Sequence, residues 1–194
     1  MRRLRECLVL CMILAGGCAS VPERPAIPLP EDLARLDRWQ ARGRLAVAGP
    51  EGGGSGSFDW RQRGERAEVS IRGPIGVGSV RLQVRGGAHP QITLETSDGQ
   101  KLQSDAALQE LEARLGATVP AASLRYWLLG LPAPGDHQWS GEGEGGPVTL
   151  EQDGWRIDYQ RYSTEPGARV PVRIRASSGE ARVRIVVDSW QLGR

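Results

Sequence analysis

Apolar and polar residues alternate in run after run of this chain, and this period of two is the feature that most restricts its fold. Alternation places the apolar side chains of a strand on one face and the polar ones on the other. The runs lie at 44–47, 57–62, 68–72, 80–85, 91–95, 148–151, 155–159, 170–176 and 182–187. Turn residues separate many of them at intervals of roughly ten residues. The pattern predicts antiparallel strands in a sheet that is covered on one side only.

Helical spacing interrupts this alternation in one long stretch. A first segment, about 105–115, has an apolar face, and a second, 121–129, stops at Gly130-Leu131-Pro132. No helices separate the remaining strands, which excludes parallel βαβ units. We therefore predict a mostly β fold of the α+β class, in which a strongly curved sheet is capped by these helices on its concave, apolar face.

Residues 1–17 have the pattern of a secretory signal. Three arginines precede an apolar run that is too short for a permanent membrane span. Small residues at 15–17 lie before Cys18, whose thiolate can be alkylated. The stretch resembles a bacterial lipoprotein box, which implies a diacylglyceryl thioether on Cys18, cleavage before it and acylation of the new amino group. An ordinary secretory signal that ends near a cysteine is the alternative.

Removal of the signal changes both charge and cysteine content. Three arginines and one glutamate leave with it, which lowers the formal charge from +2 to 0. The remaining arginines alternate with acids along the sequence, so we expect no nucleic-acid partner. Cys18 is the one cysteine left, which excludes a disulfide within the chain.

The mature chain divides into a tether and one domain. Residues 18–30 are rich in proline and are predicted to form a lipidated, extended tether. Residues 31–194 have the length of one ordinary domain, which we expect to be monomeric. The domain is predicted to begin with a short amphipathic helix, because Leu33, Leu36 and Trp39 follow at helical spacing.

The candidate catalytic and cofactor-binding motifs each lack residues that their chemistry requires. The glycine-rich stretch 49–56 lacks the Gly-Lys-Ser/Thr ending of a phosphate-binding loop, and we predict a hairpin loop there. The two histidines are isolated from clustered ligands. Asp158 and Asp188 are predicted to be solvated or paired with arginines, with a paired-acid hydrolase as the alternative. We therefore expect that the protein is not an enzyme and that it binds no metal and no cofactor, apart from the covalent lipid on Cys18.

The aromatic residues favour a hollow interior. Six tryptophans stand against one phenylalanine, and indoles pack poorly in a solid core because their N–H needs a partner and their bulk leaves gaps. Around a cavity for acyl chains these traits are tolerable. The candidate lining residues are Phe58, Trp60, Trp127, Trp155, Tyr159 and Trp190. Their alternative role is as ordinary core residues.

An aliphatic residue, Ile75, lies in the turn Gly73-Pro74-Ile75-Gly76. Turn residues are usually polar because a hairpin tip reaches water. An exposed aliphatic side chain on a Gly/Pro support suits insertion into a bilayer or into a partner's groove. We therefore predict that Pro74, Ile75 and Gly76 form a membrane-insertion or release loop. The alternative is a longer loop whose Ile75 packs on a neighbouring strand.

Six motifs, taken in order, resemble those of the LolB family, the outer-membrane lipoprotein acceptors of the lipoprotein-sorting pathway. They are 39–43, 58–60, 73–76, 124–132, 154–159 and 188–190, of which 124–132 is the most specific. The resemblance covers about 36–190. It implies an unclosed antiparallel half-barrel with a helical lid over a hydrophobic cavity. It also places Ile75 where the family displays an exposed aliphatic residue that helps to release cargo.

The resemblance further implies a function in lipoprotein transfer. Such a protein accepts lipoproteins from a soluble periplasmic carrier, binds their acyl chains in the cavity and inserts them into outer-membrane phospholipid. It is lipid-anchored in the outer membrane and faces the periplasm, and Ala19 after Cys18 agrees with that location. Three alternatives stay open: a soluble carrier of the same fold, which Cys18 argues against, an acyl hydrolase, and a structural envelope lipoprotein without a ligand cavity.

Overall fold

The computed structural model describes residues 31–50, 52–73, 78–86, 90–115, 118, 120–141, 147–163 and 169–193. The signal, the tether with Cys18 and the loop residues 74–76 lie outside this part of the chain. The expectations for these segments, and for the domain boundaries that they define, therefore stay predictions.

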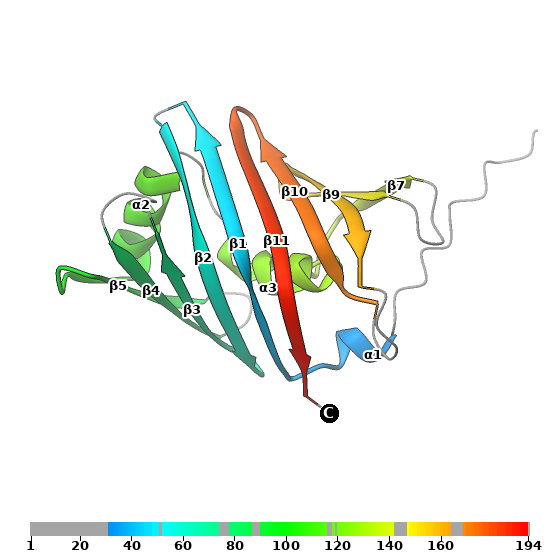
Figure 1. The fold of residues 1–194 in the computed structure, drawn as a ribbon, viewed down its shortest axis with the longest axis horizontal. Coiled ribbons are helices and arrows are strands. Elements are labelled where there is room, and N and C mark those ends of the chain that lie inside the picture. The colour runs from blue at the N-terminus through cyan, green and yellow to red at the C-terminus, as the bar shows by residue number, and fades with distance from the viewer. Residues whose placement is uncertain are drawn as a thin grey trace, which may run out of the picture.

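One antiparallel sheet of eleven strands dominates the molecule (Figure 1). Its strands are β1 (Arg38–Gly49), β2 (Gly52–Arg63), β3 (Arg66–Arg72), β4 (Ser79–Arg85), β5 (Gln91–Thr96), β6 (Lys101–Gln103), β7 (Gln138–Gly141), β8 (Val148–Gln152), β9 (Trp155–Tyr162), β10 (Pro171–Ser178) and β11 (Ala181–Leu192). Across the sheet the order is β6-β5-β4-β3-β2-β1-β11-β10-β9-β8-β7. The first and last strands thus pair at the centre, while β6 and β7 are the free edges. The sheet is curved and not closed, as predicted.

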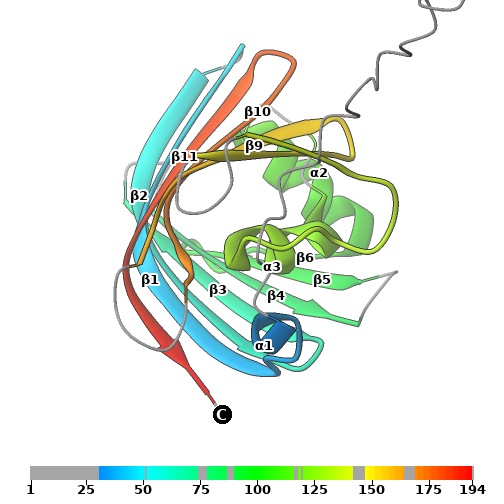
Figure 2. The same cartoon turned by 90° about the vertical axis from the view of Figure 1, so that its right-hand side faces the viewer.

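Two helices cover the concave face of this sheet (Figure 2). They are α2 (Ser104–Leu115) and α3 (Ala121–Leu129), and together we call them the helical lid. The chain leaves the edge strand β6, crosses the open side of the sheet through the lid, and enters the opposite edge strand β7. α2 packs mainly on β5 and β6. The predicted α+β half-barrel with a helical lid is therefore confirmed.

The predicted N-terminal helix is present, but its expected extension to Trp39 is wrong. Helix α1 (Glu31–Ala34) is a single turn, and β1 begins four residues later. Trp39 is a buried strand residue whose ring centroid lies 5.6 Å from that of Trp60. Burial of an indole against other aromatic rings outweighs a local spacing of three residues, which is a weak signal over so short a segment.

The predicted hairpin at 49–56 is present, but its loop is shorter than expected. β2 already starts at Gly52, which pairs with Gly49 of β1, so most of this glycine-rich stretch is strand. The glycines permit an unusually close approach of the two strands. A Cβ atom on Gly53 would lie 2.4 Å from the carbonyl oxygen of Val47. Close backbone contact, and not turn formation, explains why glycine occurs there.

Candidate functional site

An apolar cavity of about 170 Å³ lies between the concave face of the sheet and the helical lid. Strands β1–β4 and β9–β11 form its wall, and α2 and α3 form its roof. Its lining residues are all hydrophobic: Leu45, Val47, Phe58, Trp60, Val69, Ile71, Leu82, Leu111, Pro120, Leu124, Trp127, Leu128, Trp155, Ile157, Ile174, Ala176, Val183 and Ile185. Such a surface attracts hydrocarbon and offers little to a polar ligand.

Four of the six aromatic residues proposed from the sequence line this cavity: Phe58, Trp60, Trp127 and Trp155. Two of their indole N–H groups are bonded to glutamines outside the lining. Trp60 Nε1 donates to Gln62 Oε1 at 2.9 Å, and Trp127 Nε1 donates to Gln152 Oε1 at 2.9 Å. Because these polar atoms are satisfied elsewhere, the two rings contribute carbon surface to the cavity.

The other two aromatic residues, Tyr159 and Trp190, are not among the lining residues. The buried Tyr159 hydroxyl donates to the main-chain oxygen of Trp127 at 2.9 Å, so it supports α3 from the sheet. Burial raises the pKa of Tyr159 well above its usual value, which keeps the phenol neutral. Trp190 Nε1 donates to the Pro171 oxygen at 2.9 Å, and its ring lies 5.6 Å from that of Trp39.

Gln152, at the end of β8, fastens α3 and the segment that follows it. Its Oε1 accepts from Trp127 Nε1 and, at 2.8 Å, from the main-chain N–H of Ala133. Its Nε2 donates to the Ala133 oxygen at 2.8 Å. Sequence reasoning missed this residue. The available signal was a polar side chain in the apolar phase of β8, two positions after the buried Leu150.

The lid is attached unequally to the two halves of the sheet. Toward the β8–β9 hairpin, the bonds of Gln152 are joined by one from Ser123 Oγ to Asp153 Oδ2 at 2.7 Å. Toward the β2–β3 turn, α3 makes one side-chain hydrogen bond among the described residues, from Arg125 Nη1 to the Gly64 oxygen at 3.4 Å. The polar contacts of α3 thus favour the β8–β9 side, and the β2–β3 side is the weaker attachment.

A second hollow of about 330 Å³ adjoins the cavity and shares Pro120 and Trp155 with it. It is bounded by Pro50 after β1 and by Ser178 at the end of β10, so it lies at the end of the sheet where these strands finish. Asp153 and Glu180 contribute carboxylates to its wall. We infer that this end of the sheet is the entrance to the cavity.

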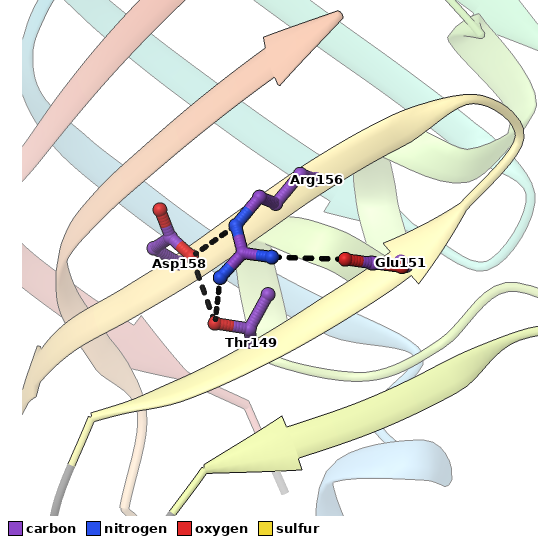
Figure 3. Close-up of polar contacts among 4 residues, drawn as sticks. All are labelled: Thr149, Glu151, Arg156 and Asp158. Atoms are coloured by element: carbon purple, nitrogen blue, oxygen red, sulfur yellow. Dashed lines mark hydrogen bonds and ion pairs between the residues drawn. The ribbon is translucent and has the colours of Figure 1, made fainter.

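The candidate catalytic carboxylates lie on the outer face of the sheet. Asp158 Oδ1 lies 3.3 Å from Arg156 Nε and accepts a hydrogen bond from Thr149 at 2.8 Å (Figure 3). Asp188 pairs with Arg44 at 3.0 Å. Both acids are arginine-paired, as predicted.

Neither a cluster of metal ligands nor a membrane-spanning helix occurs among the described residues. That part of the chain contains no group of three histidine, cysteine or acidic side chains placed to hold a metal ion. It also contains no helix that is long and apolar enough to cross a membrane.

Comparison with known proteins identifies relatives along most of the chain. The family model described as outer membrane lipoprotein LolB matches residues 37–190. Proteins named outer-membrane lipoprotein LolB from Alkalilimnicola ehrlichii and Pseudomonas fluorescens are 36% and 33% identical, over 99% and 96% of both chains. A crystal structure of a LolA superfamily protein from Nitrosomonas europaea matches 82% of this chain and 88% of its own, with a TM-score of 0.53 and 11% identity. This last likeness concerns the fold alone.

Proposed function

The chain belongs to the LolB family of outer-membrane lipoproteins, and from this premise we propose that it accepts lipoproteins from a soluble periplasmic carrier and inserts them into the outer membrane. The main support for this proposal is the wholly hydrophobic cavity under the lid. A lipoprotein presents fatty-acyl chains that water rejects, and a cavity without polar lining suits them. Cys18 is the proposed site of this chain's own lipid anchor, and no cofactor or catalytic step is part of the proposal.

The volume of the cavity in this structure limits what the cavity can hold without a conformational change. An apolar cavity of about 150 Å³ is known to hold one benzene molecule, and the cavity here has about 170 Å³. A whole acyl chain is longer than benzene, so enclosing one in this cavity alone requires part of the lid to move outward. The long bond from Arg125 to the β2–β3 turn marks the side that separates more easily.

Affinity differences are sufficient to drive the proposed transfer. Each tenfold step in affinity corresponds to about 1.4 kcal/mol, and burial of one methylene group contributes roughly 0.8 kcal/mol. A few more buried methylenes per acyl chain therefore suffice to draw cargo from a carrier into this cavity. The bilayer buries the chains completely and is the final acceptor. Transfer along such a series needs no nucleotide hydrolysis.

The release step is assigned to the loop with Pro74, Ile75 and Gly76. The change Ile75→Glu should leave cargo binding intact and abolish incorporation into the bilayer, because a carboxylate resists entry into hydrocarbon. The measurement is a hand-over assay, in which carrier loaded with a lipoprotein is mixed with this protein and liposomes, and bound and incorporated cargo are counted separately.

Two comparisons make this assay decisive. Ile75→Leu keeps an aliphatic side chain and should support both binding and incorporation. Equal loss of binding and incorporation in Ile75→Glu would count against a release role for the loop. Mass spectrometry of the mature N-terminus tests the anchor separately, since a diacylglyceryl thioether and an acylated amino group on Cys18 have a defined mass.

A further inference from the structure

Four arginines form an unbroken row across one end of the outer face of the sheet. Arg38 of β1 lies opposite Arg63 of β2, Arg63 lies opposite Arg66 of β3, and Arg66 lies opposite Arg85 of β4. All four side chains are exposed. We call them the arginine row. Along the sequence these residues are dispersed among acids, and only the strand register brings them together.

Within the part of the chain that the structure describes, the arginine row has no acidic partner, unlike several arginines elsewhere on this face. Several other arginines on this face are paired. Arg42 and Arg61 both contact Asp59, and Arg81 contacts Glu95. Among the described residues no ion pair joins the row to an acid, although Asp37 and Glu65 lie in the adjacent turns. Like charges directly opposite each other destabilise a sheet, so such a row favours an external anionic partner.

We propose that the arginine row binds the anionic phospholipid headgroups of the membrane in which this chain is anchored. Guanidinium groups match phosphate geometry and attract anionic lipid surfaces. The place where the tether enters supports this partner, because α1 and the start of β1 lie at the same end of the sheet as the row (Figure 1). The inference rests on the lipid anchor of the proposed function and adds a second, electrostatic membrane contact.

The position of the row has a consequence for orientation. β1 begins at the row and ends beside Pro50 at the cavity entrance, and its twelve residues span roughly 40 Å. With the row on the membrane, the entrance points away from the bilayer, toward an arriving carrier. Twelve residues separate Cys18 from Glu31, and such a segment reaches at most roughly 45 Å. The row therefore holds a receiving orientation, and the tether is long enough for the entrance to reach the bilayer once the row detaches.

Arginine footprinting on the lipidated protein tests this contact. The protein is reconstituted into vesicles that combine phosphatidylethanolamine with either phosphatidylglycerol or zwitterionic phosphatidylcholine, in roughly a three-to-one ratio. An arginine-specific dicarbonyl reagent is added, and modification is read by mass spectrometry. We expect the row to react about fivefold more slowly on the phosphatidylglycerol vesicles. Salt at about 1 M should remove the difference, since the Debye length is then about 3 Å.

Matched arginines on the same face provide the control. Arg175 of β10 lies opposite Arg184 of β11, away from the row, and both should react equally on the two kinds of vesicle. The double change R63Q/R66Q should abolish the protection of Arg38 and Arg85, whereas R175Q/R184Q, with the same loss of charge, should preserve it. Circular dichroism checks that each variant is folded.

Three results would overturn the proposal. The first is equal reactivity of the row on both kinds of vesicle, and the second is protection of Arg175 and Arg184 to the same extent as the row. The third is protection that appears only when the soluble carrier is added, which would assign the row to a protein partner. If the row is not protected on phosphatidylglycerol vesicles but cargo hand-over is intact, this inference alone is refuted. Loss of hand-over with an intact footprint would instead refute the proposed transfer function.

Discussion

Gly43 lies where β1 and β11 change register, between Arg42 and Gly43. Its backbone approaches the neighbouring strand so closely that a Cβ atom would lie 2.0 Å from the carbonyl oxygen of Val186 and 3.0 Å from the Phe58 ring. Both neighbours belong to the packed centre of the sheet. The absence of a side chain at this residue therefore permits the irregular pairing of the two central strands.

Substitution of this glycine should be costly. Gly43→Ala is expected to lower the free energy of unfolding by about 3 kcal/mol, because main-chain atoms of β11 must shift. Urea denaturation measures the loss. The control is Gly64→Ala, at a turn with φ of +54° and no atom within 4 Å of the added Cβ, where a loss of about 1 kcal/mol is expected. Equal losses in the two variants would contradict the steric explanation.

Single residues of the cavity were only partly predictable. Residue type pointed to Phe58, Trp60, Trp127 and Trp155, and the structure places all four at the cavity. Residue type alone could not separate these four from Tyr159 and Trp190, which are also aromatic residues in the apolar phase of their strands but lie beyond the lining. Most of the lining is aliphatic and was not singled out, because an inward-facing valine or isoleucine has the same pattern whether it touches a cavity or a neighbour.

At the scale of elements, α3 and the β8–β9 hairpin form one unit through Gln152. The change Gln152→Ala leaves the Trp127 indole N–H and both main-chain groups of Ala133 without their partner. We expect a loss of about 3 kcal/mol in the free energy of unfolding, because unpaired buried polar groups are costly. The exposed Gln91 on β5 provides the control, and Gln91→Ala should change stability by less than about 0.5 kcal/mol. A loss below about 1 kcal/mol in Gln152→Ala would show that α3 is held by other contacts.

Element prediction succeeded where a pattern was long or had clear stop signals. α3 runs from Ala121 to Leu129, as its apolar spacing and the following Gly130 predicted, and Gly130 adopts φ of +79° as the helix cap. The edge strands β6 and β7 have only three and four residues, too few to show a period. Trp39 illustrates the opposite error, in which a chance helical spacing masks a strand that long-range pairing with β11 defines.

At the scale of the whole molecule, the sequence predicted a curved sheet capped by helices because both elements had apolar faces to bury. It could not predict the arginine row or the cavity volume. The row depends on strand register across four strands, and the volume depends on how side chains from nine helices and strands fill a shared space. These properties arise only when distant segments meet.

If the space under the lid binds acyl chains, a side chain that fills this space should block binding. Ala176 lines the cavity, whereas Ala46 occupies the outer face of β1, opposite Arg184. Saturable binding of an apolar fluorescent probe is measured for the protein and for Ala176→Phe and Ala46→Phe. We expect Ala176→Phe to weaken binding at least about tenfold and Ala46→Phe to bind normally. Unchanged binding in Ala176→Phe, or no saturable binding in the unaltered protein, would contradict this expectation and favour a structural lipoprotein with a solid core.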